Sequence, residues 1–151
     1  MLRRQLLTRI ALAALAPVSA LPRAAAAAPK PNLAFDEMYA GVSVLGIKFS
    51  DKLKSLAGRE TTILGFMAPP LKADADFLVL TKSPVSLCPF CNTDADWPDS
   101  IIVVYLGKRQ DFVQSNRLIA VTGTLELGSR TDEETGFVSL VRLVNAHFEV
   151  V

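Results

Sequence analysis

The chain has 151 residues, the length of one domain, and it is 50% hydrophobic and 21% charged. This composition excludes a disordered chain, which carries more charge and fewer apolar residues. Two cysteines and one histidine exclude a disulfide-dense miniprotein and argue against a histidine-rich metal site. No apolar run of membrane-spanning length follows the N-terminal segment, so a bundle of membrane helices is excluded too.

Residues 1–28 have the pattern of an export signal, with four arginines and no acidic residue. The apolar stretch at 10–21 has the length of a signal-peptide core and is too short for a transmembrane helix. The alanines at 24–28 offer A-x-A sites, so we expect cleavage near Ala28 and a periplasmic protein without membrane insertion. The arginine pair at positions 3 and 4 resembles a twin-arginine signal, with an ordinary Sec signal as the alternative.

Removal of this segment would change the sign of the net charge. The whole chain has 16 basic and 15 acidic residues, and four of the basic ones lie in the segment, which leaves 12 against 15, or −3. Nucleic-acid binding depends on clustered lysines and arginines that neutralise phosphates, and the remaining cations are scattered. We therefore expect no nucleic-acid partner and no electrostatic attachment to an anionic membrane.

Residues 29–49 are expected to form an N-terminal arm, and residues 50–151 the folded domain. Ser50 is a typical N-cap, because its hydroxyl can accept a backbone N–H of the first helical turn. Gly58 can adopt the left-handed conformation that ends a helix. The pattern predicts a short helix over 51–57, ahead of the first core strand.

Five segments rich in β-branched and aromatic residues follow, separated by glycine, proline and polar residues. Gly123 interrupts the fourth segment and predicts a bulge there, while 128–136 has the composition of a hairpin loop. Five strands, one of them long and bulged, and one short helix favour an all-β fold, a five-stranded OB-like barrel, with a small sandwich as the alternative. The predicted strands are 61–67, 77–81, 101–106, 118–127 and 137–151.

Both cysteines lie in one motif, Cys88-Pro89-Phe90-Cys91, between the second and third predicted strands. The motif allows three interpretations, of which the first is a disulfide. The cell envelope is oxidising, but closing so short a loop stabilises a fold by only about 2 kcal/mol. A disulfide would make the protein a structural or protein-interaction module with a locked loop.

The second interpretation is thiol–disulfide exchange, for which C-P-x-C is the motif in thioredoxin-like proteins. That chemistry needs a long helix after the motif, whose N-terminus lowers the thiol pKa. Acidic residues and Pro98 follow here instead. We therefore expect that the protein is not an enzyme, and thiol–disulfide exchange is the one enzymatic alternative.

The third interpretation is a transition-metal site, with zinc as the expected ion. A C-x-x-C motif places two thiolates on one metal, and Zn²⁺ takes four ligands, or three and a water. Asp94 and Asp96, just after Cys91, and His147 on the last predicted strand are the candidates for the other positions. His147 shares a face of that strand with Glu149, where an exposed histidine without a ligand role is the alternative.

The chain also resembles a family of exported bacterial proteins, domain of unknown function 3299. The similarity runs over about residues 53–106, through a Leu-x-Gly turn, a Gly-Phe-Met-x-Pro-like strand, a second apolar strand, a cysteine element and a third strand. In this sequence these motifs are Leu56-Ala57-Gly58, Gly65-Phe66-Met67-Ala68-Pro69, Phe77-Leu78-Val79-Leu80, Cys88 and Ile101-Ile102-Val103-Val104-Tyr105.

The resemblance implies a small OB-like periplasmic protein with an accessory or metal-handling role, because some members are found beside transporter components for metal uptake. It also implies an envelope transporter component or another periplasmic protein as the partner. The family has Cys-x-His at the cysteine element, so Cys88 matches the family cysteine and Cys91 substitutes for the histidine. Both residue types bind transition metals, so the resemblance favours a shared metal role.

Overall fold

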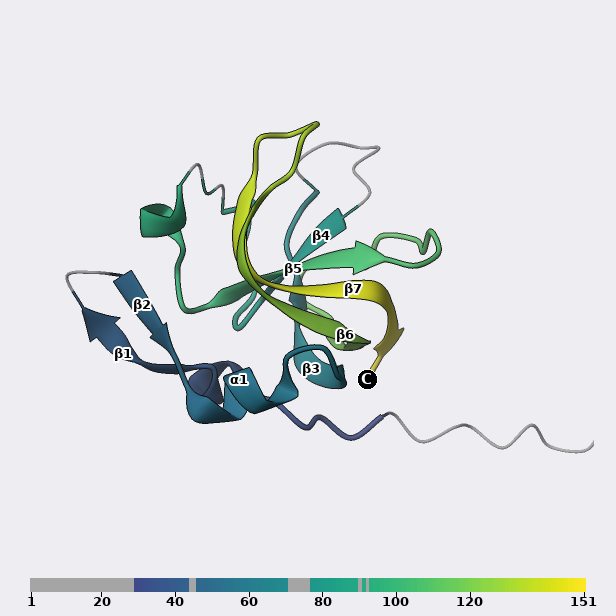
Figure 1. The fold of residues 1–151 in the computed structure, drawn as a ribbon. Coiled ribbons are helices and arrows are strands. Elements are labelled where there is room, and N and C mark those ends of the chain that lie inside the picture. Colours follow the sequence, from purple (N-terminus) through teal and green to yellow (C-terminus); the bar gives the residue numbers. More distant parts are fainter. Residues whose placement is uncertain (1–28, 44–45, 71–76, 90, 92) are drawn as a thin grey trace, which may run out of the picture.

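The computed structural model describes residues 29–43, 46–70, 77–89, 91 and 93–151, and the predicted export signal lies outside them. The described part is mostly β, with one α-helix, which confirms the all-β prediction (Figure 1). Two short 3₁₀ helices and seven strands complete it. In chain order the elements are η1 Phe35–Glu37, β1 Tyr39–Ser43, β2 Gly46–Phe49, α1 Asp51–Leu56, β3 Glu60–Met67, β4 Phe77–Thr81, η2 Asp94–Asp96, β5 Ile101–Leu106, β6 Leu118–Thr131 and β7 Val138–Val150.

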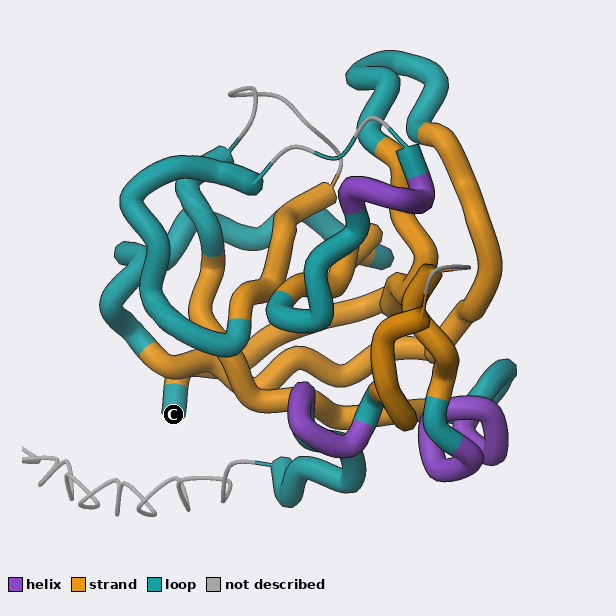
Figure 2. The backbone as a smooth tube through the Cα atoms, turned by 90° about the vertical axis from the view of Figure 1, so that its left-hand side faces the viewer, coloured by secondary structure: helices purple, strands orange, loops and turns teal. Residues whose placement is uncertain are grey.

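Five strands close into a barrel in the order β3-β4-β5-β7-β6, and β6 pairs with β3 to complete the ring. All neighbours are antiparallel except β5 and β7, which run parallel. Figure 2 shows these strands curling round one another, with long loops outside them. The hairpin of β1 and β2 forms a separate two-stranded sheet.

The barrel is stabilised by continuous apolar strands. Every residue of β4 and the first four of β5 are buried, as expected for strands covered on both faces. Cys91 and Trp97, from the loop between these strands, belong to the same buried cluster. The predicted strands at 77–81 and 101–106 are confirmed with their exact bounds.

Helix α1 begins where the sequence predicts and ends one residue earlier. The Ser50 hydroxyl accepts the backbone N–H of Leu53 at 3.0 Å, which is an N-cap bond. Gly58 has a φ of 74°, in the left-handed region favoured after a helix. The helix buries Leu53 completely and is one residue shorter than predicted, because Ala57 is its C-cap.

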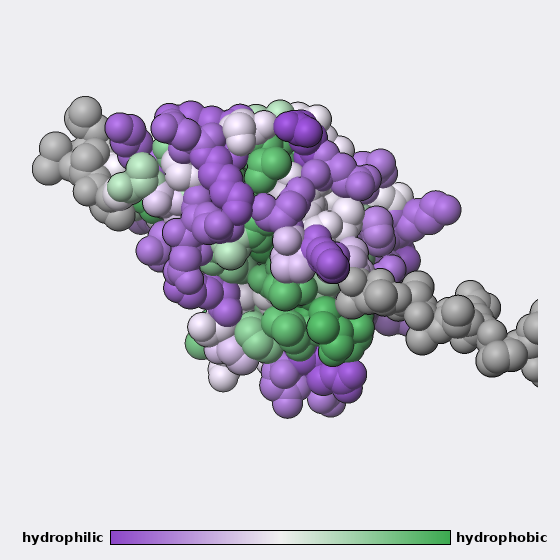
Figure 3. All heavy atoms as spheres, turned by 90° about the horizontal axis from the view of Figure 1, so that it is seen from below, coloured by the Kyte–Doolittle hydropathy of each residue, from purple (hydrophilic) through white to green (hydrophobic). Residues whose placement is uncertain are grey.

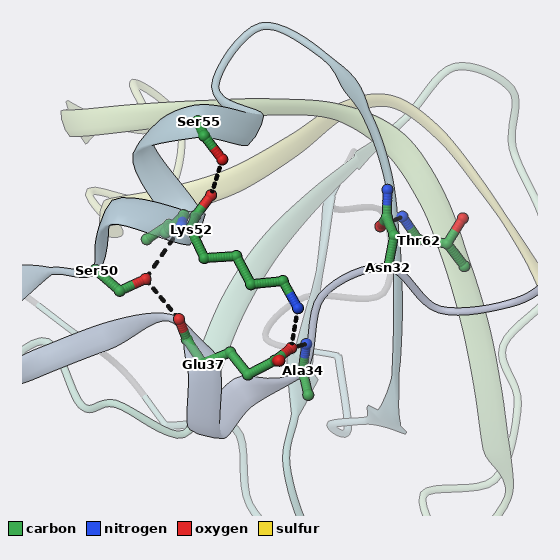
Figure 4. A network of polar contacts seen from close by, with 8 residues as sticks. Asn32, Ala34, Glu37, Ser50, Lys52, Ser55 and Thr62 are labelled. Atoms are coloured by element: carbon green, nitrogen blue, oxygen red, sulfur yellow. Dashed lines mark hydrogen bonds and ion pairs between the residues drawn. The ribbon is translucent and has the colours of Figure 1, made fainter.

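The predicted N-terminal arm is packed into the same core as the barrel. Leu33 forms a parallel bridge with Ile63 of β3, and the Thr62 backbone N–H donates to Asn32 Oδ1 at 2.8 Å (Figure 4). Leu33 and Met38 are fully buried. Strand β4 pairs with β3 only at its last two residues, so the arm covers an edge that the barrel leaves open.

Polar contacts join this arm to α1 (Figure 4). The Glu37 carboxylate accepts from Lys52 Nζ at 2.6 Å and from the Ala34 backbone N–H at 3.0 Å. Ser50 Oγ donates to the Glu37 carbonyl at 2.5 Å. The Lys52 ammonium lowers the pKa of Glu37, but both side chains are exposed, so screening by water keeps this ion pair weak.

Strand β7 contains a bulge. The sequence predicts this bulge at Gly123, which lies on the partner strand β6. Thr122 pairs with His147 and Thr124 pairs with Val144, so the extra residue lies on β7, opposite Gly123. Asn145 has a φ of 49° there, a conformation that asparagine tolerates better than most residues. Gly123 is still required, because a Cβ on it would lie 2.7 Å from the Ala146 Cβ.

A second bulge lengthens β6 beyond its predicted end. Leu127 pairs with Val141 and Arg130 with Ser139, so the extra residue is on β6, where Gly128 has a φ of 107°. Glycine at positive φ lets the strand continue through the irregularity. The predicted loop at 128–136 is therefore strand up to Thr131, and the connection shrinks to 132–137.

Figure 3 views the molecule from below Figure 1, the side on which α1 and the C-terminal end of the chain lie. A contiguous hydrophobic area occupies part of this face between hydrophilic margins. Among the described residues, the large hydrophobic side chains that are exposed are Leu87, Phe112, Val150 and Val151. No helix in the described ranges has the length and apolar character needed to cross a membrane.

Candidate functional site in the cysteine loop

The cysteine motif lies in the long connection between β4 and β5, and this loop rests on the β6–β7 hairpin. The Val138 backbone N–H donates to the Cys91 carbonyl at 2.9 Å, at the first residue of β7. Ser129 Oγ of β6 donates to Asp94 Oδ1 at 2.6 Å. These bonds fix the second half of the loop to the barrel wall.

The β1–β2 hairpin holds the loop through Trp97. The side chain of Trp97 is buried, and its indole N–H donates to the Tyr39 hydroxyl at 2.8 Å. Burial raises the pKa of Tyr39 to about 12, so the phenol remains neutral at physiological pH. The loop is therefore attached to two separate sheets.

Both cysteines are free thiols, Cys88 half-buried and Cys91 buried. The Cys91 thiol donates to the Asp96 carbonyl at 3.6 Å, and the Cys88 thiol to the Pro89 carbonyl at 3.8 Å. Burial raises the pKa of both, that of Cys91 to about 11, with smaller contributions from the Asp96 charge and from Cys88. Neutral thiols are poor nucleophiles, which is unfavourable for thiol–disulfide exchange.

The two aspartates proposed as metal ligands help to shape the loop. Asp96 Oδ2 accepts from the backbone N–H and the hydroxyl of Thr93, at 3.1 and 2.9 Å. Asp94 is held by Ser129, as described above, and both carboxylates are on exposed residues. Their oxygens are engaged beside the motif and would have to exchange these hydrogen bonds for metal bonds.

His147 is far along β7 from the cysteine loop. It pairs with Thr122 of β6, nine positions beyond Val138, the residue that contacts Cys91. Nine residues of regular extended strand would span at most about 30 Å along the chain. His147 is exposed beside the buried Ala146 and Phe148, so the predicted orientation toward the polar face is correct.

Within the described ranges, no three side chains of His, Cys, Asp or Glu are grouped so that they could hold one metal ion. Of the predicted donor set, Cys91 is buried and Cys88 half-buried, and Cys88 has a small effect on the pKa of Cys91. Structural zinc sites use four protein ligands, so this chain alone supplies an incomplete set, and zinc binding stays a prediction.

The loop anchors could not be read from the sequence. Tyr39 and Ser129 are 58 and 35 positions from their partners, and no motif links such distant residues. Trp97 gave the one usable signal, because a lone tryptophan in a polar loop is expected to pack against the barrel.

The folded chain was also compared with known structures. A crystal structure of a DUF3299 family protein from Pseudomonas aeruginosa PAO1 superposes with a TM-score of 0.53 at 13% sequence identity, over 82% of this chain and 97% of that one. The chain has a DUF3299-like fold. No protein-family model matches the sequence, and no curated protein matches it.

The DUF3299-like fold agrees with the family resemblance seen in the strand motifs. At 13% identity the similarity concerns the fold alone, because one fold hosts many functions. The geometry of the cysteine loop itself is therefore the basis for assigning it a role.

Proposed function

We propose that the protein is an exported accessory binding module of the cell envelope, which recognises another envelope protein through its cysteine loop. The observation that carries this proposal is Leu87, 82% exposed and next to Cys88, in the first half of a loop whose second half is anchored to two sheets. An exposed apolar side chain can serve as an interface anchor, and a loop that is tethered on one side gives up less conformational entropy on binding than a free one.

We further infer that the barrel is of the OB type. The strand order β3-β4-β5-β7-β6 with one parallel pair supports this, because it is the order of a five-stranded Greek-key barrel. The twin-arginine or Sec signal predicted at 1–28 supports export to the periplasm.

In the oxidised form, Cys88 and Cys91 would close into a disulfide that fixes the loop. Each thiol gives up its proton, one S–S bond forms, and two electrons pass to a disulfide oxidant of the envelope. Cys88 contributes a small part of the raised pKa of Cys91, which supports the proximity of the two thiols. The bond would restrict the loop next to Leu87 and reduce the cost of ordering it on binding.

A photo-cross-linker placed at Leu87 tests the recognition surface. We expect the mature protein, expressed with its export signal, to form one discrete adduct with an envelope protein from this position. The matched control carries the cross-linker at Lys48, an exposed residue of β2. The same adduct from both positions would contradict the proposal.

The role of the disulfide is tested in the same assay with Cys88→Ser and Cys91→Ser. We expect both to weaken the Leu87 adduct to a similar extent, with a folded barrel by circular dichroism. An adduct of unchanged yield in the double variant would show that the thiols do not support recognition.

Zinc binding by the two thiols is the second candidate, favoured by two free cysteines in neighbouring positions. Since one chain offers two suitable ligands, a second copy or the partner would supply the others. Metal binding, like oxidation to the disulfide, would have to displace the thiol protons, which the raised pKa values disfavour.

Native mass spectrometry of protein purified without chelator or reductant separates the two candidates. A metal-free mass that is lower by two hydrogen atoms indicates the disulfide. A mass higher by one zinc, which is lost after chelation and absent in Cys88→Ser, indicates the metal site. The zinc candidate is excluded if that variant binds zinc as tightly as the original chain.

A further inference from the structure

A second site lies away from the cysteine loop, at the corner where β5 leads into the loop before β6. There a cavity of about 550 Å³ opens between residues 107–110 and the bulged part of β7. This volume is in the range of small-molecule sites. Its lining residues are Gly107, Lys108, Arg109, Gln110, Asn145, Ala146 and His147.

Both walls of the cavity are fixed by hydrogen bonds. The Gln110 side-chain amide donates to the Phe148 carbonyl at 2.9 Å and accepts the Phe148 backbone N–H at 2.8 Å, as a neighbouring strand would. The Gly107 backbone N–H donates to the Ala146 carbonyl at 2.9 Å. The backbone of both walls is therefore held in place without a ligand, which lowers the entropic cost of binding.

The bulge at Asn145 forms part of the cavity wall. A Cβ on Gly107 would lie 2.4 Å from Asn145 Oδ1, so the Asn145 side chain lies directly against the backbone of Gly107. Downstream of the bulge, Ala146 is buried and His147 is exposed at the cavity. The bulge in β7 thus places the His147 side chain beside residues 107–110.

The cavity carries positive charge and hydrogen-bond donors without an acidic residue in its lining. In the described part of the chain, the side chains of Lys108, Arg109 and His147 make no hydrogen bond or ion pair. Some cations elsewhere, among them Lys52, Lys82 and Arg142, are paired with carboxylates. Unpaired cations beside a preformed cavity are the features that recognise oxyanions.

We propose that this cavity binds a small solute through an oxyanion group, either a carboxylate or a phosphate. Arg109 and Lys108 supply the charged donors, and the Asn145 amide and the His147 ring supply further N–H groups. The site is independent of the cysteine loop, since it shares no residue with it.

Amide chemical shifts of the isotope-labelled mature protein test the proposal, with inorganic phosphate and acetate as separate probes. We expect saturable shifts at 107–110 and 145–147 with at least one probe. Saturation with phosphate alone identifies a phosphate group, and saturation with acetate alone a carboxylate. The double variant Lys108→Ala/Arg109→Ala should weaken binding at least about tenfold, because it removes both charged donors.

The matched control is Lys48→Ala/Arg59→Ala, which changes the net charge equally at two exposed cations outside the cavity. It should bind as the original chain does. If both double variants bind the probe equally weakly, the effect comes from overall charge, and the proposed binding site is wrong. The absence of saturable shifts at the cavity with either probe would also overturn it.

Discussion

The two thiols show how a motif's surroundings decide its chemistry. Cys91 is buried and Cys88 half-buried, and burial raises both pKa values. Thioredoxin-like chemistry needs the opposite shift, which a helix N-terminus provides. Here the residues after Cys91 form a single 3₁₀ turn, Asp94–Asp96, with two acidic residues.

Alkylation should reveal this shift. In Cys88→Ser, we expect the rate of iodoacetamide reaction at Cys91 to rise with pH well above the thiol's ordinary pKa of 9.0, toward about 11. Because the folded-state pKa is the higher one, the protonated thiol stabilises the fold below pH 9.0, and this contribution is lost as pH rises through about 11.

Mass spectrometry of quenched time points measures that alkylation rate. The same variant in denaturant is the control and should react with a midpoint near 9.0. Equal midpoints in the folded and unfolded chain would show that burial does not protect Cys91.

Sequence reasoning at this scale found the thiols and the exposure of His147, because both follow from local pattern. It did not find what Asp94 and Asp96 bind. A carboxylate close to a C-x-x-C motif suggests a ligand, but its partners Ser129 and Thr93 are revealed only by the folded loop.

Strands β6 and β7 pack closely at Gly123, where there is no room for a side chain. A Cβ at Gly123 would lie 2.7 Å from the Ala146 Cβ and 3.0 Å from the Val144 carbonyl oxygen. Neither atom is the free end of a flexible side chain. The corresponding Cβ at Gly107 would meet the Asn145 side-chain amide, which can rotate.

We therefore expect Gly123→Ala to lower the free energy of unfolding by about 1–3 kcal/mol, the usual cost of forcing extra volume into a packed site. Gly107→Ala is the matched comparison and should cost less. Urea unfolding followed by circular dichroism gives both values. A smaller loss for Gly123→Ala than for Gly107→Ala would contradict the packing described for this pair.

The strand segments were predictable because each is a short apolar run between turn residues. Phe77–Thr81 and Ile101–Leu106 match their predicted bounds for this reason. The ends of β6 and the position of the β7 bulge were not predictable, because glycine marks an irregular backbone without showing which of two paired strands holds the extra residue.

For the whole molecule, the main surprise is the arm over residues 29–49. Its composition resembles a linker, yet Leu33, Phe35 and Met38 are buried with the barrel core. The arm lies over the part of β3 that β4 does not reach. A barrel lacking this arm would expose apolar surface and unpaired backbone along β3.

Substitution of Met38 tests whether the arm belongs to the folding unit. Met38 is fully buried, so Met38→Ala should destabilise the whole domain by about 2–5 kcal/mol, the usual range for such a cavity. The measurement is the urea midpoint of the barrel signal. Lys30→Ala, at an exposed arm residue, is the control and should leave the midpoint unchanged.

If Met38→Ala leaves the barrel midpoint unchanged, the arm is an appendage and not part of the fold. The sequence did not reveal this role of the arm, because its apolar residues follow no regular period. The five barrel strands were predictable from five apolar segments, although the sequence left a small sandwich as the alternative to a barrel, and a DUF3299 family protein of 13% sequence identity has a similar fold.

The extra residue at Asn145 divides β7 into two halves with opposite alternation. Before it, the odd-numbered Val141 and Leu143 point to the core, and after it the even-numbered Ala146 and Phe148 do so. Deleting this one residue would turn the second half over, sending His147 inward and Phe148 into water. The single insertion thus lets one strand line the barrel along its whole length and still offer its only histidine to the solvent.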